Sequence, residues 1–270
     1  VNNDRLVPKN STYVGVHAEG VLFGNDPWFR GMSIKYGPDG GVYISDWHDI
    51  GECHDSDGSH RSSGRIFKVV YGKPEKRSVD LERLTDFELT KLHLHPNAWH
   101  VRHARRILQE RASSGEVGLA ARKRLRVIFA EDKDERNKLR ALWTLFVIED
   151  FEQPDIVRLL SHDNQHVRRW AVRFLVDRGH PDSAALTAMA RLAREDASPK
   201  VRLALACALQ RLKLEHRWDI AEALLGHGED AQDPYIPLMI WYGIEPLVHA
   251  DNSAALKLAA GSKLSLLRRY

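Results

Sequence analysis

The segment Val167-Arg-Arg-Trp-Ala-Val-Arg-Phe-Leu-Val176 decides the fold, because its pattern returns further along the chain as Val201-Arg-Leu-Ala-Leu-Ala-Cys-Ala-Leu209. The same Val-Arg pair stands at Val101-Arg102, 66 positions before Val167, whereas Val201 lies 34 positions after it. Leu139-Arg140 falls between Val101 and Val167 in a looser register. Apolar residues three and four positions apart predict a helix in each segment. A period of about 33 residues that holds two helical stretches is typical of stacked helix pairs, because one pair cannot bury its apolar face alone.

Four to five such pairs fit between about Asp80 and Tyr270. A Val-Arg pair near the start of the second helix of each pair resembles the HEAT repeat family, and the resemblance covers most of the chain from Asp80 onward. It implies an α-solenoid and carries no chemistry by itself. Thr85-Asp-Phe-Glu88 predicts a helix that begins with a capping box, and Ser198-Pro199 predicts a capping hydroxyl before a first-turn proline.

Residues 1–76 have a different character, with eleven glycines and little helical periodicity. Alternating apolar residues from Met32 to Tyr36, the turn Gly37-Pro-Asp-Gly-Gly41 and the run Val42-Tyr-Ile-Ser45 predict a β-hairpin. Arg65-Ile-Phe-Lys-Val-Val-Tyr71 predicts a third strand. The predicted fold class is therefore α+β, mainly α: a short antiparallel β segment at 1–76, followed by a HEAT-like helical repeat domain at 77–270.

Composition excludes several classes of protein. Hydrophobic residues make up 43% and charged residues 29% of the 270 residues, which excludes a disordered or collagen-like chain. No window of eighteen apolar residues predicts a membrane span, and the first residues lack the apolar core of a signal peptide. Because the chain begins with Val, we expect an upstream portion to have been removed. The two cysteines, Cys53 and Cys207, exclude a disulfide framework but leave the redox compartment undetermined.

The densest group of reactive side chains lies between Asp46 and His60. Zinc would prefer its cysteine and histidines, whereas calcium would prefer its aspartate oxygens, but the spacing matches neither a zinc ribbon nor an EF-hand. A solvated loop whose polar side chains cap its own turns is the favoured alternative, and direct catalysis is a third. The candidate metal ligands are His48, Asp49, Cys53, His54, Asp55, Asp57 and His60.

Four N-terminal motifs and one C-terminal motif carry a second resemblance. They are Asn25-Asp-Pro-Trp-Phe-Arg30, Gly37-Pro-Asp-Gly-Gly-Val-Tyr-Ile-Ser-Asp-Trp47, Cys53-His54, Gly64-Arg-Ile-Phe-Lys-Val-Val-Tyr71 and Asp233-Pro-Tyr-Ile-Pro-Leu-Met-Ile-Trp-Tyr-Gly-Ile-Glu-Pro-Leu247. Together they look like the last propeller blade and following repeats of the bacterial membrane-bound dehydrogenase family. That family is related to the glucose and sorbosone dehydrogenase β-propellers, which use pyrroloquinoline quinone (PQQ).

The resemblance implies PQQ and Ca²⁺ for the full-length family, sugars or polyols as substrates, and a periplasmic or cell-surface location. Residues 1–76 supply little more than one blade, whereas a closed propeller needs about four to eight. We therefore expect this chain alone to bind no cofactor, and we assign no catalytic residue. The family often carries a c-type haem domain, but no Cys-x-x-Cys-His motif occurs here, which rules out haem attachment through it.

Basic residues gather between Asn97 and Arg126, a stretch that contains eight of them and only two acidic residues, Glu110 and Glu116. Nucleic-acid binding is disfavoured, because aromatic residues for base stacking are not interleaved among these arginines. In stacked repeats such arginines commonly pair with carboxylates, here Asp132, Asp134 and Glu135. The candidate interaction surface consists of Arg102, Arg105, Arg106, Arg168 and Arg169.

Two functional hypotheses follow. In the first, the chain is the C-terminal portion of a PQQ-type sugar or polyol dehydrogenase-like protein, not catalytic alone, whose helical repeats hold the missing blades or another protein. In the second, it is a HEAT-type protein-interaction scaffold with no enzymatic role. Whether the chain belongs to an enzyme stays open between them.

Overall fold

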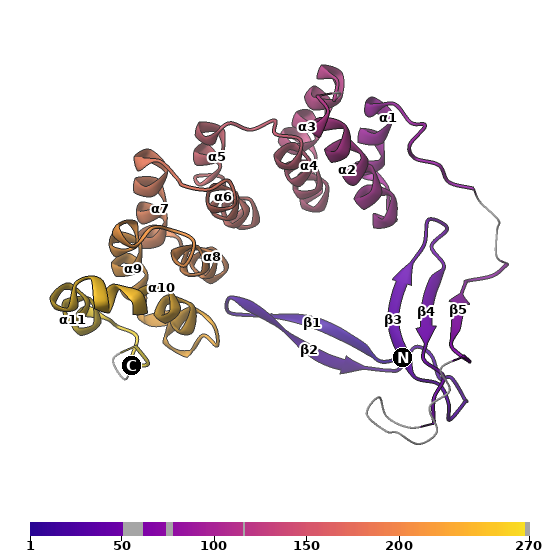
Figure 1. Cartoon of the computed structure of the whole chain (residues 1–270), viewed down its shortest axis with the longest axis horizontal. Coiled ribbons are helices and arrows are strands. Elements are labelled where there is room, and N and C mark those ends of the chain that lie inside the picture. The colour runs from indigo at the N-terminus through magenta and orange to yellow at the C-terminus, as the bar shows by residue number, and fades with distance from the viewer. Residues whose placement is uncertain (51–61, 74–77, 116, 268–270) are drawn as a thin grey trace. The chain divides into compact units, whose positions relative to one another are not determined.

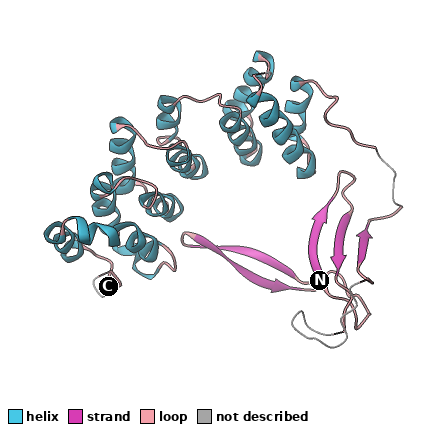
Figure 2. Ribbon diagram, in the orientation of Figure 1, coloured by secondary structure: helices cyan, strands magenta, loops and turns pink. Residues whose placement is uncertain are grey.

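The computed structural model of the chain describes residues 1–50, 62–73, 78–115 and 117–267. Strands come first along the chain and helices follow, as Figure 2 shows. The predicted fold class, α+β and mainly α, is confirmed. The predicted boundary between residues 76 and 77 lies outside the described residues, and that division of the chain stays a prediction.

The predicted hairpin is confirmed as part of a three-stranded antiparallel sheet. Its strands are β3 (Gly31–Tyr36), β4 (Val42–Asp46) and β5 (Arg65–Val69), with β4 in the centre. In the turn between β3 and β4, Gly40 adopts a positive φ of 80°, which glycine accepts without steric cost. The third strand was predicted to end at Tyr71, but it ends at Val69.

One face of this sheet is apolar and largely uncovered. Ile34 pairs with Ile44, and Ile44 pairs with Phe67, so the three side chains lie on the same face. Ile44 is buried, but Ile34 remains 52% exposed and Phe67 38% exposed. Val69, on the same face, is also exposed. A row of exposed apolar side chains on a sheet is typical of a surface that other structure covers.

A second hairpin, formed by β1 (Asn3–Lys9) and β2 (Thr12–Ala18), is not predicted by the sequence pattern. In its short turn, Asn10 takes a positive φ of 49°, which asparagine tolerates better than most residues. In β1, Leu6, Val7 and Pro8 are consecutive and interrupt any alternation, so the strand has no clear period of two.

The helices follow in the order seen in Figure 1. They are α1 (Asp86–Lys91), α2 (Ala98–Ser113), α3 (Leu119–Glu131), α4 (Glu135–Val147), α5 (Gln153–Leu159), α6 (Gln165–Asp177), α7 (Ser183–Glu195), α8 (Pro199–Leu209), α9 (Trp218–Leu225), α10 (Ile236–Ala250) and α11 (Asn252–Gly261), with short 3₁₀ turns at Leu92–Leu94, Leu214–His216 and Gly228–Gln232.

The chain forms two compact units. The first comprises Val1–Arg5 and Val16–Ile148, and the second comprises Leu6–Gly15, the tip of the first hairpin, and Glu149–Tyr270. In the second unit α5, α7 and α9 pack in one layer, and α6, α8 and α10 pack in the other. In the first unit α1 packs on α3, and α2 packs on α4. This two-layer stacking of successive helix pairs is the arrangement that the repeat period predicted.

The repeated Val-Arg pairs lie near the starts of α2, α6 and α8. Val101, Val167 and Val201 are each at most 1% exposed, which explains why the sequence keeps an apolar residue there. Gly243 on α10 lets that helix approach α8, because a Cβ atom at Gly243 would lie 2.5 Å from Leu209 Cβ. The core therefore runs along the interior faces of the helix pairs.

One of the two predicted helix starts is confirmed in full. Thr85 accepts a hydrogen bond from the Glu88 backbone N–H, and the Glu88 carboxylate accepts one from the Thr85 N–H, which completes the capping box. Ser198 is the N-cap residue of α8 and Pro199 occupies the first turn, as predicted, but the Ser198 hydroxyl makes no capping hydrogen bond. The Ser198 hydroxyl donates instead to Gln165 Oε1 at 2.6 Å, so it joins α8 to α6.

Among the described residues, no helix combines the length and the apolar character that crossing a membrane requires.

A buried histidine lies at the centre of the first unit. His93 Nδ1 lies 3.2 Å from the Leu89 carbonyl oxygen, and Nε2 lies 2.7 Å from Thr144 Oγ1. Burial, and to a lesser extent the nearby charges of Arg105 and Arg140, lower the pKa of His93 from 6.5 to about 4. The folded protein therefore holds this histidine neutral, whereas the unfolded chain binds a proton at mildly acidic pH.

We expect the free energy of unfolding to fall as the pH drops from 6.5 to about 4, by about 3 kcal/mol from His93 alone. Chemical denaturation at several pH values measures this. The His93→Gln variant should lose this part of the pH dependence, whereas His17→Gln, at an exposed position, should keep it. Equal slopes in the wild-type protein and His93→Gln would show that the histidine does not titrate on unfolding.

Candidate interaction surface

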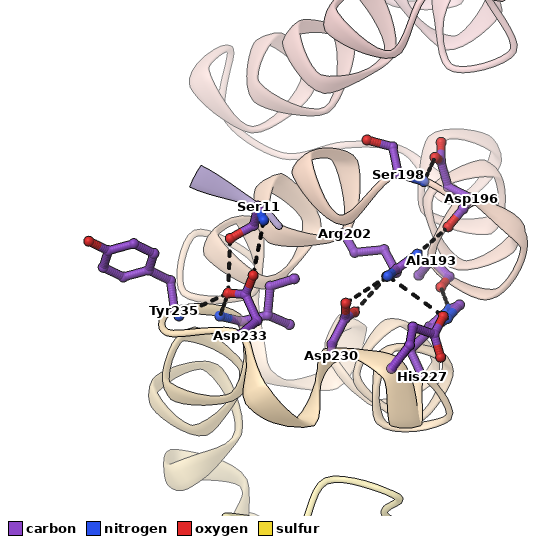
Figure 3. Close-up of polar contacts among 11 residues, drawn as sticks. Ser11, Ala193, Asp196, Ser198, Arg202, His227, Asp230, Asp233 and Tyr235 are labelled. Atoms are coloured by element: carbon purple, nitrogen blue, oxygen red, sulfur yellow. Dashed lines mark hydrogen bonds and ion pairs between the residues drawn. The ribbon is translucent and has the colours of Figure 1, made fainter. Parts of the chain in front are cut away.

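Two ion pairs, one half-buried and one buried, repeat along the second unit. Arg168 on α6 donates to both oxygens of Asp196, at 2.6 and 3.0 Å, and Arg202 on α8 donates to both oxygens of Asp230, at 2.6 Å each. The separation along the chain between arginine and aspartate is the same in both pairs. Each arginine also donates through Nη1 to the carbonyl six residues before it, at His162 and Asp196. Asp196 thus contacts both arginines, Arg168 through its carboxylate and Arg202 through its backbone carbonyl, and Figure 3 shows the second contact.

The second pair is the more deeply buried, since 3% of the Arg202 side chain and 4% of the Asp230 side chain are exposed. Burial alone would lower the pKa of Arg202, but the hydrogen bonds and charge of Asp230 outweigh it and raise that pKa. A bidentate arginine–carboxylate pair with its remaining donors satisfied fixes both position and orientation. The two pairs therefore hold each repeat in register with the next.

The tip of the first hairpin forms a second polar cluster, around Asp233 (Figure 3). The backbone N–H of Ser11 donates to Asp233 Oδ2 at 3.0 Å, and its hydroxyl donates to Oδ1 at 2.9 Å. Asp233 also accepts from the backbone N–H groups of Tyr235 and Ile236 at the start of α10. Burial tends to raise the pKa of Asp233, but these hydrogen bonds together lower it, so the carboxylate stays ionised.

A groove of about 460 Å³ opens on the layer of α6 and α8. Its lining is part basic and part apolar, and consists of Arg169, Trp170, Arg173, Val176, Asp177, Lys200, Leu203, Ala204, Cys207, Ala208 and Arg211. Lys200 also lies over the ring of Tyr13 on the hairpin tip, 4.9 Å from its centroid. The hairpin tip therefore lies beside the groove.

The charges in the groove do not balance. Four cationic side chains line it with a single carboxylate, Asp177. Arg173 and Arg211 each lie 3.4 Å from an oxygen of Asp177, and both arginines are more than half exposed. The guanidinium of Arg173 also stacks on Trp170, 5.1 Å from its ring centroid. Exposed ion pairs of this kind are weak, so these arginines can exchange one carboxylate for another.

Cys207 is a free, exposed cysteine on α8, within the lining of the groove. Neighbouring side chains desolvate its sulfur and raise the pKa of the thiol. Little thiolate therefore forms at neutral pH, which makes the residue a slow but usable chemical reporter of the groove.

Three of the predicted surface arginines lie on α2 in the first unit. Arg102 donates to the Tyr36 hydroxyl and lies over the Tyr36 ring, and Arg106 pairs with Glu110 one turn along the helix. Arg105 is part-buried against Trp143, 5.0 Å from its ring centroid, and donates to Thr144 Oγ1. Burial and then the charges of Arg140 and Arg102 lower the pKa of Arg105 to about 10. The contacts of Arg102 link α2 to the sheet, those of Arg105 link α2 to α4, and that of Arg106 stays within α2.

The other two predicted arginines lie on α6, where Arg168 forms the ion pair with Asp196 and Arg169 lines the groove. The expectation that Val-Arg arginines pair with carboxylates of neighbouring repeats is met by Arg168 and Arg202. Two of the named carboxylates have other partners: Asp134 caps α4 and pairs with Arg136, and Asp132 accepts from Asn137. As an interaction surface, the five predicted arginines stay a prediction.

Most of the predicted metal ligands, namely Cys53, His54, Asp55, Asp57 and His60, lie outside the described residues. His48 has a positive φ of 55°, and its backbone N–H donates to Asp46. Asp49 is buried and accepts from Trp47 Nε1 at 3.2 Å. Across the part of the chain that the structure describes, no three His, Cys, Asp or Glu side chains converge on a metal position. The metal site stays a prediction.

Asp46, beside these residues, holds the end of the sheet together. It accepts from the backbone N–H groups of Arg30 and His48 and from Arg65 Nε, at 2.7 to 3.0 Å. Burial tends to raise the pKa of Asp46, but these hydrogen bonds outweigh it and hold that pKa below its usual range. Asp46 therefore acts as a structural anchor for the strand ends, with its acceptor oxygens already used.

Comparison with known proteins supports the helical part. Residues 123–210, which include α6 and α8, match the family of HEAT repeats. No curated protein and no solved structure matches the chain. The matched region is thus a HEAT-like helical repeat, and the resemblance of the remaining sequence to dehydrogenases has no support from these comparisons.

We predict that Asp230→Asn lowers the free energy of unfolding by roughly 3 kcal/mol, because the buried Arg202 guanidinium loses its bidentate partner and keeps only the exposed carboxylate of Glu229, 3.6 Å away. Asp177→Asn removes the same charge from exposed pairs and should cost about 1 kcal/mol or less. Urea unfolding of both variants measures the difference. Equal and small losses would mean that the buried pair contributes little to holding the repeats.

Proposed function

We propose that the protein is a helical-repeat scaffold that binds another protein along the layer formed by α6 and α8. The observation that carries this proposal is the groove, where an unbalanced set of cations lies beside apolar side chains on two adjacent repeats. Stacked repeats commonly use such extended surfaces for binding, and the HEAT match over residues 123–210 supports the same architecture.

The arginines of α6 and α8 fall into a structural set and a groove-lining set, and this separation supports the proposal further. Arg168 and Arg202 are engaged in holding the repeats together, so substituting them would disturb the fold. Arg169, Arg173 and Arg211 line the groove, and the ion pairs of Arg173 and Arg211 with Asp177 are exposed. A partner can therefore bind the arginines that line the groove without breaking the ion pairs that hold the repeats together.

Site-specific photo-crosslinking in cells of the source organism tests the scaffold function. Leu203→p-benzoylphenylalanine places a photoreactive group in the groove, and Arg194→p-benzoylphenylalanine places one at an exposed position of α7. We expect a discrete adduct with one partner protein from position 203 and none from position 194. Adducts of equal yield at both positions, or none at 203, would contradict the proposal.

We also propose, as a second candidate, that the β3–β5 sheet completes a β-propeller of a PQQ-dependent sugar or polyol dehydrogenase-like protein. The uncovered apolar face formed by Ile34, Phe67 and Val69 favours this candidate, because adjacent blades of a propeller cover such faces. PQQ, Ca²⁺, the substrate class and a periplasmic or cell-surface location all belong to this proposal, and all come from the sequence resemblance.

Dye reduction by the full-length protein with PQQ, Ca²⁺ and a panel of sugars and polyols tests this second candidate. We expect substrate-dependent reduction that Phe67→Ser weakens, because the variant removes apolar area from the uncovered face. Lys35→Ser, at a position on the opposite face of the sheet, should leave it unchanged. Absence of reduction across the panel, or equal loss in both variants, would count against a propeller enzyme.

A further inference from the structure

We infer that the groove between α6 and α8 binds an acidic peptide segment that carries an apolar anchor residue. This inference rests on the proposed scaffold function and specifies its partner. The groove lies within the second unit, and all of its lining residues belong to two neighbouring repeats and the turn that follows α8.

The sign of the partner's charge follows from the lining. The lining contains four cationic side chains and one carboxylate, that of Asp177. An acidic segment would therefore neutralise positive charge that the groove leaves uncompensated. The cations are Arg169, Arg173, Lys200 and Arg211. The guanidinium groups can receive carboxylates in bidentate geometry, which favours aspartate and glutamate over a diffuse negative charge. Because two of these arginines already share one carboxylate at 3.4 Å, incoming carboxylates would replace a contact of the same kind.

The apolar part of the lining calls for an anchor side chain. Trp170, Val176, Leu203 and Ala204 supply apolar surface beside the cations. A volume of about 460 Å³ lies within the range of pockets that enclose small ligands, so it has room for one or two side chains of a peptide. A segment that alternates carboxylates with leucine or a similar residue matches both features.

Nucleic acid fits the same groove less well. Binding of a single strand uses successive aromatic platforms, whereas the face of Trp170 is already stacked by Arg173. The ion pairs of Arg168 and Arg202 fix the backbones of both helices, so the groove is formed before a partner arrives.

Fluorescence anisotropy with defined peptides tests the inference. The probe is a fluorescein-labelled peptide of about a dozen residues that repeats Glu-Asp-Leu, and its neutral counterpart repeats Gln-Asn-Leu. We expect the acidic peptide to bind more tightly, by roughly tenfold or more, and to weaken with added salt. The double variant Arg173→Gln, Arg211→Gln should lose roughly tenfold in affinity for the acidic peptide.

The matched control is the double variant Arg83→Gln, Arg136→Gln, which removes the same charge from exposed, ion-paired arginines outside the groove. It should bind the acidic peptide as the wild-type protein does. Circular dichroism melting confirms that each variant is folded. In a Cys53→Ser background, the acidic peptide should also slow alkylation of Cys207 by iodoacetamide, which locates the peptide in the groove.

Equal loss in both double variants, equal affinity for the neutral peptide, or unprotected Cys207 would overturn the inference. Tighter binding of a single-stranded oligodeoxynucleotide of equal charge would overturn it in favour of nucleic acid. If the wild-type protein binds no acidic peptide while photo-crosslinking at position 203 still yields one protein adduct, the partner chemistry is wrong and the scaffold function stands.

Discussion

The buried pairing of an arginine in one helix with an aspartate that follows the next helix along the chain is the interaction on which the second unit depends. Arg202 and Asp230 are almost completely removed from water, so each charge must be satisfied within the protein. The bidentate contact holds α8 against the 3₁₀ turn at Gly228–Gln232, which contains Asp230. The same geometry at Arg168 and Asp196 extends the constraint by one repeat. Apolar packing drives the helices together, and the ion pairs select their register.

This constraint explains how one surface of the repeats remains available for binding. On α6, Arg168 points to its buried partner, whereas Arg169 and Arg173 line the groove. Neighbouring positions on the helix thus serve either the interior or the groove, and the sequence pattern carries both functions at once. The hairpin tip, held by Ser11 on Asp233, adds Tyr13 beside Lys200 at the edge of the same surface.

Much of this architecture could be predicted from local patterns. Buried valines at Val101, Val167 and Val201 reveal the helices, because helix periodicity survives in the sequence. Alternation and the glycine turn reveal β3 and β4. The first hairpin escaped prediction because Pro8 and adjacent apolar residues in β1 obscure its period. The bond between Ser11 and Asp233 joins residues 222 positions apart, and nothing local in the sequence indicates it.

The candidate site was only partly predictable, because it too depends on contacts between residues that are far apart in the sequence. Arg168 and Arg169 were both predicted on the strength of their charge, but charge alone cannot distinguish a buried structural arginine from one in a groove. Aligning the two repeats would have shown aspartates at a constant distance from Arg168 and Arg202. The groove itself depends on how α6 and α8 pack, which becomes visible only in three dimensions.

A double-mutant cycle on Arg202 and Asp230 measures whether their pairing sets the register of the repeats. We expect Arg202→Met and Asp230→Leu each to be strongly destabilising, and the double variant to lose far less free energy of unfolding than the sum of the two. Additive losses would show that the two charges act independently, and would contradict a repeat register set by their pairing.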